Sequence, residues 1–159
     1  MAESVEDFWR AYRASLLPDS RPPEAPPAAW SFGSTPEMAD ELGGLVRAGV
    51  KTGTASLLWA YEAEGEPLPQ AGAISLILDS AGQPLCLIET TSVAVKPFTE
   101  VDEAHAWSEG EGDRSLRSWR EVHWRVFSQE CAILGRAPAE DMPVVCERFR
   151  LLFTGDQDT

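Results

Sequence analysis

The sequence predicts one α+β domain of 159 residues, in which a small mixed or closed β-sheet is flanked by helices. Two observations predict this class. Apolar runs typical of strands follow one another in a mostly hairpin-like order, with few helices between them. Three other segments combine helical apolar spacing with the end signals of helices. Because a doubly wound sheet alternates strands with helices, that architecture is disfavoured.

The N-terminal part reads as an addition to the main domain. A first helix is predicted after Ser4, whose hydroxyl can cap it, and it ends before the first proline of a proline-rich stretch. Residues 18–29 contain five prolines and are typical of an extended linker or surface loop. We therefore expect residues 1–29 to form a helix and loop that pack back over a main domain at 30–153. The polar tail at 154–159 is expected to be disordered.

The main domain begins with a second well-marked helix. Thr35 supplies a capping hydroxyl, Pro36 occupies the first turn, and Gly49 is a natural stop. The predicted strands are 54–61, 73–78, 85–95 and 144–153. The turn-forming residues 79–84 join the second and third of these as a hairpin. The remaining predicted helices are 101–108 and 115–134, separated by an acidic, glycine-broken loop at 109–114.

Charge and cysteine content narrow the function and the location. The net charge of −13 opposes non-specific binding to polyanions and anionic membranes, so a nucleic-acid function needs a local basic cleft and a short target. The cysteines, Cys86, Cys131 and Cys146, have no metal-ligand spacing and are expected to be buried free thiols. The N-terminus lacks a signal peptide pattern, and no apolar run approaches about 20 residues. We expect a cytoplasmic protein without a membrane contact, either a monomer or a homodimer.

Lys51 is the most informative residue of the chain. It lies in the run Gly-Val-Lys-Thr-Gly-Thr-Ala-Ser at 49–56, and it is one of two lysines in a chain that otherwise uses eleven arginines. A lysine ammonium is a compact charge suited to polarising a substrate or transferring a proton. The alternative is a solvated lysine after a helix end, where cations are favoured in any case.

Other polar residues of the predicted strands are candidates for the same site. Thr54 and Ser56 alternate onto one strand face and are suited to holding a carbonyl, a phosphate or an oxyanion, although threonine is also a good strand former. Tyr61 ends that predicted strand and is a further substrate-binding candidate. Glu89 shares a face with leucines and a valine, so desolvation would make it a general base if that face points inward. If the face points outward, Glu89 faces solvent or pairs with an arginine.

One locally basic stretch, residues 112–125, carries four arginines with aromatic residues among them. Arginines bind phosphate and flat rings stack on bases, so this stretch is a candidate for nucleic-acid contact. However, its apolar spacing indicates a helix that is mainly structural. The apolar residues concerned are Leu116, Trp119, Val122 and Val126. Arg114 and Ser115 are the better substrate-binding candidates, because the helix N-terminus offers free backbone N–H groups.

The sequence contains no ligand motif for a metal. His105 and His123 have no zinc-ligand spacing. Glu109, Glu111 and Asp113 have the oxygen ligands that Mg²⁺ or Ca²⁺ prefers, but a solvated acidic loop is the stronger interpretation. We therefore expect no cofactor, and a divalent cation is an option without a supporting motif.

Six segments occur together in an order typical of one family. They are Trp-Ser-Phe-Gly at 30–33, Ala-Asp-Glu-Leu at 39–42, the lysine run at 49–56, Leu-Cys-Leu-Ile-Glu-Thr-Thr at 85–91, Glu-Gly-Glu-Gly-Asp-Arg-Ser at 109–115, and Val-Cys-Glu-Arg-Phe at 145–149. Over residues 30–153 the chain resembles the larger bacterial members of the ASCH domain family, within the PUA-like superfamily. The resemblance implies a PUA-like β-barrel and a cleft that includes the motif lysine and binds RNA or nucleotides.

The resemblance also implies a choice of activities. Some similar family members cleave RNA, whereas smaller members remove acyl groups from the N4 nitrogen of cytidine with a lysine, a threonine and a glutamate. By motif these three correspond to Lys51, Thr54 and Glu89, and the N-terminal helix, proline loop and long helix depart from the smaller members. We expect a hydrolase that acts on single-stranded RNA or a nucleotide and resembles a ribonuclease. The alternatives are an N4-acylcytidine amidohydrolase and a non-catalytic module that reads a modified base.

Overall fold

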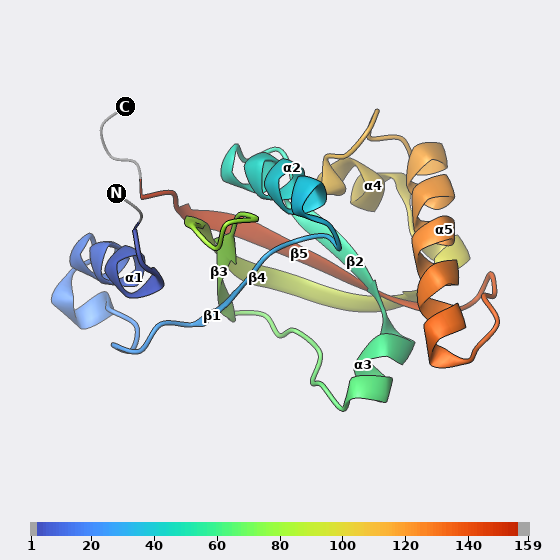
Figure 1. Ribbon diagram of the computed structural model, residues 1–159, viewed down its shortest axis with the longest axis horizontal. Coiled ribbons are helices and arrows are strands. Elements are labelled where there is room, and N and C mark those ends of the chain that lie inside the picture. Colours follow the sequence, from blue (N-terminus) through green and yellow to red (C-terminus); the bar gives the residue numbers. More distant parts are fainter. Residues whose placement is uncertain (1–2, 156–159) are drawn as a thin grey trace. The chain divides into compact units, whose positions relative to one another are not determined.

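The computed structural model describes residues 3–155 and has the expected mixed α+β, PUA-like architecture (Figure 1). Its α-helices are α1 (Val5–Ala14), α2 (Pro36–Arg47), α3 (Leu58–Glu64), α4 (Glu103–Glu109) and α5 (Leu116–Leu134). Its strands are β1 (Ala28–Trp30), β2 (Gly53–Leu57), β3 (Ile74–Leu78), β4 (Pro84–Pro97) and β5 (Pro143–Phe153). Two short 3-10 turns, η1 (Pro18–Ser20) and η2 (Phe98–Glu100), complete the elements.

The strands form one sheet in the order β1-β3-β4-β5-β2. β1 runs parallel to β3, whereas β3 pairs with β4 and β2 pairs with β5 in antiparallel fashion. The described chain divides into two compact units, which we call unit 1 (3–49, 73–89 and 150–155) and unit 2 (50–72 and 90–149). Strands β4 and β5 each contribute residues to both units.

In unit 1, the N-terminal helix is tied to the sheet. The Ser4 hydroxyl accepts a hydrogen bond from the backbone N–H of Asp7 at 3.0 Å, which caps α1 as predicted. The apolar face of α1 packs with β3, β4 and the end of β5 in one hydrophobic cluster. Its buried members are Phe8, Trp9, Tyr12, Leu76 and Leu87. The expected packing of the N-terminal helix over the domain is therefore present within unit 1.

The proline-rich segment is more structured than the expected extended linker. Trp9 Nε1 donates to the carbonyl of Pro23 at 3.0 Å, and Arg13 Nε donates to the carbonyl of Pro22 at 2.9 Å, so α1 holds the loop. The segment contains the η1 turn, and β1 at its end pairs with β3. The expected boundary between residues 29 and 30 thus falls inside β1. Three residues are enough to form this edge strand of the sheet.

The predicted strand at 54–61 is only half correct. β2 ends at Leu57, and the next seven residues form α3, so Tyr61 is helical. The sequence of α3 is rich in the helix formers alanine, leucine and glutamate, and Gly65 ends it in the left-handed conformation with φ of 67°. Trp59 packs against the core of unit 2, which fixes the helical turn. Tertiary packing therefore overrides the strand propensity of the aromatic residues.

The core of unit 2 lies between helix α5 and the strands. Trp119, Phe127 and Cys131 are buried along one face of α5, together with residues from β2, α4 and β5. Val122 and Val126, which the sequence placed in the core, are each more than one third exposed. Figure 1 shows α4 near one end of α5 and α3 near the other, in agreement with the contacts between these helices.

All three cysteines are free and buried, as expected. Burial raises the pKa of Cys86 to about 12 and that of Cys146 to about 11, so neither thiol is a ready nucleophile. No helix within residues 3–155 has both the length and the apolar character needed to cross a membrane. The expected disorder at 154–159 falls mainly on residues 156–159, which lie outside the described residues.

The packing of α5 predicts the effect of one core substitution. Phe127→Ala should lower the free energy of unfolding by about 3–5 kcal/mol, because the buried ring leaves a cavity that the core only partly refills. Ile133→Ala on the same helix is the matched control, since Ile133 is 85% exposed and should change stability by less than about 0.5 kcal/mol. Chemical denaturation measures both. Equal losses for the two variants would contradict the assigned face of α5.

Candidate functional site

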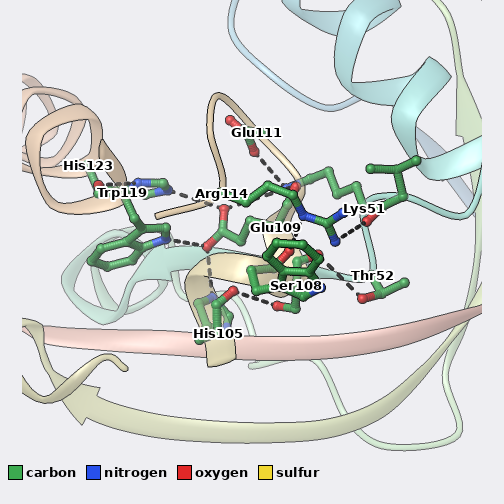
Figure 2. Close-up of polar contacts among 11 residues, drawn as sticks. Lys51, Thr52, His105, Ser108, Glu109, Glu111, Arg114, Trp119 and His123 are labelled. Atoms are coloured by element: carbon green, nitrogen blue, oxygen red, sulfur yellow. Dashed lines mark hydrogen bonds and ion pairs between the residues drawn. The ribbon is translucent and has the colours of Figure 1, made fainter. Parts of the chain in front are cut away.

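Lys51 lies inside unit 2, in the segment that leads into β2, and its side chain is only 1% exposed. Its Nζ contacts Glu111 Oε2 at 2.8 Å, Glu109 Oε1 at 3.5 Å and the Glu109 carbonyl at 3.4 Å (Figure 2). The alternative interpretation of a solvated lysine after a helix end is therefore wrong. A buried ammonium with two carboxylate partners is held in one position and keeps its charge compensated.

Glu109 is the centre of the site. Its Oε2 accepts hydrogen bonds from Trp119 Nε1 at 2.7 Å and from His105 Nε2 at 2.8 Å. Its Oε1 lies 3.3 Å from His123 Nε2 and faces Lys51. The expected solvated acidic loop is thus wrong at this position, because Glu109 ends α4 and is 2% exposed. The carboxylate joins α4, α5 and the segment before β2.

The surroundings of Glu109 keep its carboxylate ionised. Burial alone acts to raise its pKa, but hydrogen bonds from His105 and His123 and the charge of Lys51 outweigh burial. The net result is a Glu109 pKa far below the ordinary value. The site therefore contains a permanent negative charge at its centre, and Lys51 is oriented by it.

The two histidines belong to the structure of the site, and no zinc spacing in the sequence signals them. His105 lies one helical turn before Glu109 on α4, so the two side chains share a face. His123 stacks on Trp119 with ring centroids 4.2 Å apart, and its Nδ1 contacts the Trp119 carbonyl at 2.9 Å. Within residues 3–155, no group of three or more histidine, cysteine or acidic residues is arranged to hold a metal ion.

Two glycines allow the segment before β2 to approach the end of α4. The backbone N–H of Thr52 donates a hydrogen bond to the Ser108 carbonyl at 2.6 Å, and this bond joins the two segments. A Cβ on Gly53 would collide with the Ser108 hydroxyl, and a Cβ on Gly110 would lie 2.8 Å from the Val50 carbonyl. Gly53, two residues after Lys51, and Gly110, which follows Glu109, are therefore required. Only glycine allows the two segments to approach closely enough for Lys51 and Glu109 to form their ion pair.

Arg114 and Ser115 have well-defined structural contacts beside the lysine. Arg114 Nε donates to the Trp107 carbonyl at 2.9 Å and Nη2 donates to the Val50 carbonyl at 3.3 Å. The Ser115 hydroxyl caps α5 by accepting from the backbone N–H of Ser118 at 3.1 Å. Arg114 thus borders the lysine segment, whereas the Ser115 hydroxyl is engaged by its own helix. Substrate binding by either residue stays a prediction.

Thr54, Ser56 and Tyr61 are grouped around a different carboxylate of unit 2. Thr54 lies directly opposite Glu147 in the β2–β5 register. The Glu147 carboxylate accepts a hydrogen bond from the Thr90 hydroxyl at 2.7 Å, and burial raises its pKa. Burial also raises the pKa of Tyr61, with Ser56 acting in the opposite direction and Glu147 adding to the increase. In the sequence, Glu147 lies in the Val-Cys-Glu-Arg-Phe segment of the family resemblance, but nothing there singles it out as a site residue.

Glu89 belongs to unit 1, where it lies on β4 opposite Ile74 of β3. Arg150 Nη2 and Nε contact Glu89 Oε1 at 2.6 and 2.8 Å, so the carboxylate pairs with an arginine as one of the two sequence interpretations stated. The carboxylates that contact Lys51 are Glu109 and Glu111. A catalytic role for Glu89 stays a prediction.

Comparison with known proteins identifies the family of this chain. A profile of the ASCH domain matches residues 28–152, which include the lysine run, α4, α5 and β5. The chain belongs to the ASCH domain family. It is 34% identical to an ASCH domain from Lactobacillus crispatus, with a TM-score of 0.84 and 92% of each chain covered. It is 37% identical to a protein from Enterococcus faecalis, with a TM-score of 0.83, covering 95% of this chain and 89% of that one. Among the curated proteins no match is found.

The ASCH domain assignment confirms the resemblance drawn from the sequence. In this ASCH domain protein, the motif lysine and the Glu-Gly-Glu run are the two sequence segments that the fold brings into contact. The hydrogen bonds of Thr52 and Arg114 hold those segments from both sides.

The first prediction from the site concerns stability at neutral pH. Glu109→Gln should lower the free energy of unfolding by about 3–5 kcal/mol, because an amide leaves the buried Lys51 ammonium with less compensating charge. Glu121→Gln on α5 is the matched control, since Glu121 makes only an exposed contact with Arg117 at 3.9 Å. Thermal and denaturant unfolding give the comparison. A loss no larger than that of the control would contradict a central role for Glu109.

The second prediction concerns acid. The folded-state pKa of Glu109 lies below the unfolded value of about 4.3, so the unfolded chain takes up a proton first as the pH falls. The stabilisation from Glu109 is therefore complete above about pH 5 and is lost progressively at lower pH. The difference in unfolding free energy between the wild type and Glu109→Gln should narrow from about pH 5 to pH 3. A difference that stays constant over this range would show that the carboxylate is not stabilised by folding.

Proposed function

We propose that the protein binds single-stranded RNA or a nucleotide at the Lys51–Glu111 pair and hydrolyses it, with ribonuclease-like cleavage as the leading activity. The observation that carries the proposal is the 2.8 Å contact between a lysine buried to 99% and a carboxylate that is 30% exposed. Lys51 is held in position by the buried carboxylate of Glu109, whereas Glu111 is partly exposed to solvent. Membership of the ASCH domain family supports RNA as the general class of ligand.

In the proposed reaction Lys51 and Glu111 have separate roles. Glu109 holds the ammonium in place, so Lys51 is preorganised to stabilise negative charge that develops on a phosphate. Glu111 lies on a loop with left-handed glycines on either side, Gly110 with φ of 70° and Gly112 with φ of 59°. An anionic group that approaches Lys51 displaces the Glu111 carboxylate, which then lies beside the reacting group as a base.

The proposed cleavage balances its protons within the site. The 2′-hydroxyl of the RNA attacks the adjacent phosphorus and gives its proton to Glu111. The bond from phosphorus to the 5′-oxygen breaks, and that oxygen takes a proton from Lys51. The products of this step are a 2′,3′-cyclic phosphate and a free 5′-hydroxyl, and proton exchange with water restores both residues. Water then attacks the cyclic phosphate and the bond from phosphorus to the 2′-oxygen breaks. The 2′-oxygen takes a proton from the water, which leaves a 3′-phosphate and completes the hydrolysis. We propose that this reaction proceeds without a cofactor, which chelation of divalent cations in the assay tests.

A second candidate is the N4-acylcytidine amidohydrolase, and two observations favour it. The net charge of −13 opposes a long polyanion, and a lysine at 1% exposure suits a small substrate. In addition, Thr54 lies opposite Glu147, whose raised pKa brings it closer to the range of a general base. In this reaction the Thr54 hydroxyl would attack the amide carbonyl and give its proton to Glu147. The bond from the carbonyl carbon to N4 would then break, with the leaving amine taking that proton from Glu147. Water, giving a proton to Glu147, would hydrolyse the resulting Thr54 ester, and the Thr54 oxygen would regain the proton as the free acid leaves.

The experiment uses labelled single-stranded RNA and, in parallel, N4-acetylcytidine with ultraviolet detection. We expect the wild type to cleave RNA and Lys51→Met to lose at least about a hundredfold in rate, because a preorganised charge is removed. Glu111→Gln, on the more exposed partner, should lose about a hundredfold or more through the proton transfer while keeping the fold. Lys96→Met is the matched control, since Lys96 makes only a 3.9 Å contact with exposed Asp102.

Each other outcome selects a different function. Normal RNA cleavage by Lys51→Met would remove this residue from the mechanism. Turnover of N4-acetylcytidine without RNA cleavage would establish the second candidate. Lysine-dependent binding of nucleotides without turnover of either substrate would identify a non-catalytic binding module.

A further inference from the structure

We infer that Trp107 and Arg114 form a stacking platform for one unpaired nucleobase beside the Lys51–Glu111 pair. The inference rests on the proposed function, because it names the part of the nucleotide that the site recognises. The two residues come from the end of α4 and from the loop before α5, and the Arg114 guanidinium carbon lies 3.7 Å from the centre of the Trp107 ring.

Trp107 is exposed where its neighbours are buried. Ala106, Ser108 and Glu109 are each at most 4% exposed, whereas Trp107 is 59% exposed. Its backbone is fixed on both sides, because its carbonyl accepts from Arg114 and the next carbonyl accepts from Thr52. A large apolar ring on a rigid backbone at the surface of a folded domain is typical of a binding contact, since water contact with the ring is unfavourable.

Arg114 is held in place at the expense of backbone strain. Among the non-glycine residues between 3 and 155, Arg114 alone has a positive φ, of 64°. This conformation is unfavourable for a residue with a long side chain, and such strain concentrates at binding and catalytic sites. In this conformation the guanidinium donates to the carbonyls of Trp107 and Val50, and its central carbon lies 3.7 Å from the centre of the indole ring. The guanidinium lies over the ring on one side, and 59% of Trp107 is nevertheless exposed to solvent.

The platform adjoins the ion pair through the chain itself. Val50, which accepts from Arg114, directly precedes Lys51, and Trp107 precedes Glu109 by two residues. In the proposed binding mode, a base stacked on Trp107 places its sugar and phosphate towards Lys51 and Glu111. The aromatic face supplies affinity for any base, because every base has a flat π-surface, and the guanidinium adds positive charge beneath the ring.

A second arginine–tryptophan pair in unit 2 packs against the hydrophobic core and serves as a comparison. The guanidinium of Arg136 lies 4.2 Å from the Trp59 ring centre, but Trp59 is partly buried against the hydrophobic core. Both pairs have the same chemistry, and they differ in the exposure of the ring. Arg136→Gln is therefore a matched control for loss of an arginine–tryptophan contact.

The test compares cytidine 5′-monophosphate and adenosine 5′-monophosphate with ribose 5-phosphate, which lacks the base, by calorimetric titration. The wild type should bind the nucleotides at least about tenfold more tightly than ribose 5-phosphate, as expected for base–aromatic stacking. Trp107→Leu should abolish this preference, Trp107→Phe should keep most of it, and Arg136→Gln should leave it unchanged. Thermal unfolding of each variant checks the fold independently, and the exposure of Trp107 predicts little change.

The outcomes separate this inference from the proposed function. Nucleotide binding that depends on Lys51 but is equal in the wild type and Trp107→Leu would overturn the platform and leave the proposed function standing. A wild type without preference for nucleotides over ribose 5-phosphate would also overturn the platform. If the wild type bound neither nucleotides nor single-stranded RNA, the proposed function and the platform would both be wrong.

Discussion

The architecture of unit 2 depends on the burial of one carboxylate. Removing an ionised glutamate from water costs several kcal/mol unless its oxygens regain hydrogen bonds and opposite charge. Glu109 regains them from Trp119 and His105 on one oxygen, and from His123 and Lys51 on the other. These partners come from α4, α5 and the segment before β2, so the network is complete only when all three segments are in place. The fold and the position of the lysine are thus specified by the same contacts.

The two acidic residues of the Glu-Gly-Glu run, Glu109 and Glu111, differ in what they can contact. Glu109 is too deeply buried and too fully hydrogen-bonded to meet a ligand, so in the proposed reaction it acts only through the orientation of Lys51. Glu111 shares the ammonium but retains partial exposure on a glycine-flanked loop. The intervening Gly110 is required because a side chain there would collide with the Val50 carbonyl. Glu109 and Glu111 are therefore only two positions apart in the chain, yet the carboxylate of Glu109 is buried and that of Glu111 can be reached by solvent.

Much of the fold could be predicted because its signals are local. The caps of α1, α2 and α5 are hydroxyls that bond to the next turn of their own helices, so the short sequence around each cap contains the whole interaction. Lys51 was identifiable for a similar reason, since a rare lysine in a glycine-rich turn stands out in a chain dominated by arginine. Tyr61 was assigned to a strand because an aromatic run fits strand and helix alike, and packing of Trp59 against the core decided for the helix.

The rest of the site depends on contacts between distant segments, which no local pattern records. Glu109 reads as a solvated residue in an acidic loop, and its burial follows only once His123 and Trp119 on α5 are brought against α4. The apolar stripe predicted for α5 is only partly correct. His123 lies beside Glu109 on the inner face, whereas Val122 and Val126 are each more than one third exposed. The pairing of Glu89 with Arg150 joins residues 61 positions apart.

The protein as a whole carries a strong negative charge, whereas Lys51 provides a local positive charge. This contrast limits the ligands that the proposed site can bind. At physiological ionic strength charges are screened over about 8 Å, so a ligand at Lys51 experiences mainly the nearby groups, whereas a long nucleic acid also meets the acidic surface beyond them. The chain carries 26 acidic against 13 basic residues, which disfavours an extended phosphate backbone. Discrimination in such a setting has to come from uncharged contacts, and an exposed indole backed by a guanidinium is suited to this because stacking is insensitive to net charge. The proposed site is suited to one base and its phosphate, and therefore to the ends or loops of RNA in preference to a duplex whose bases are already stacked.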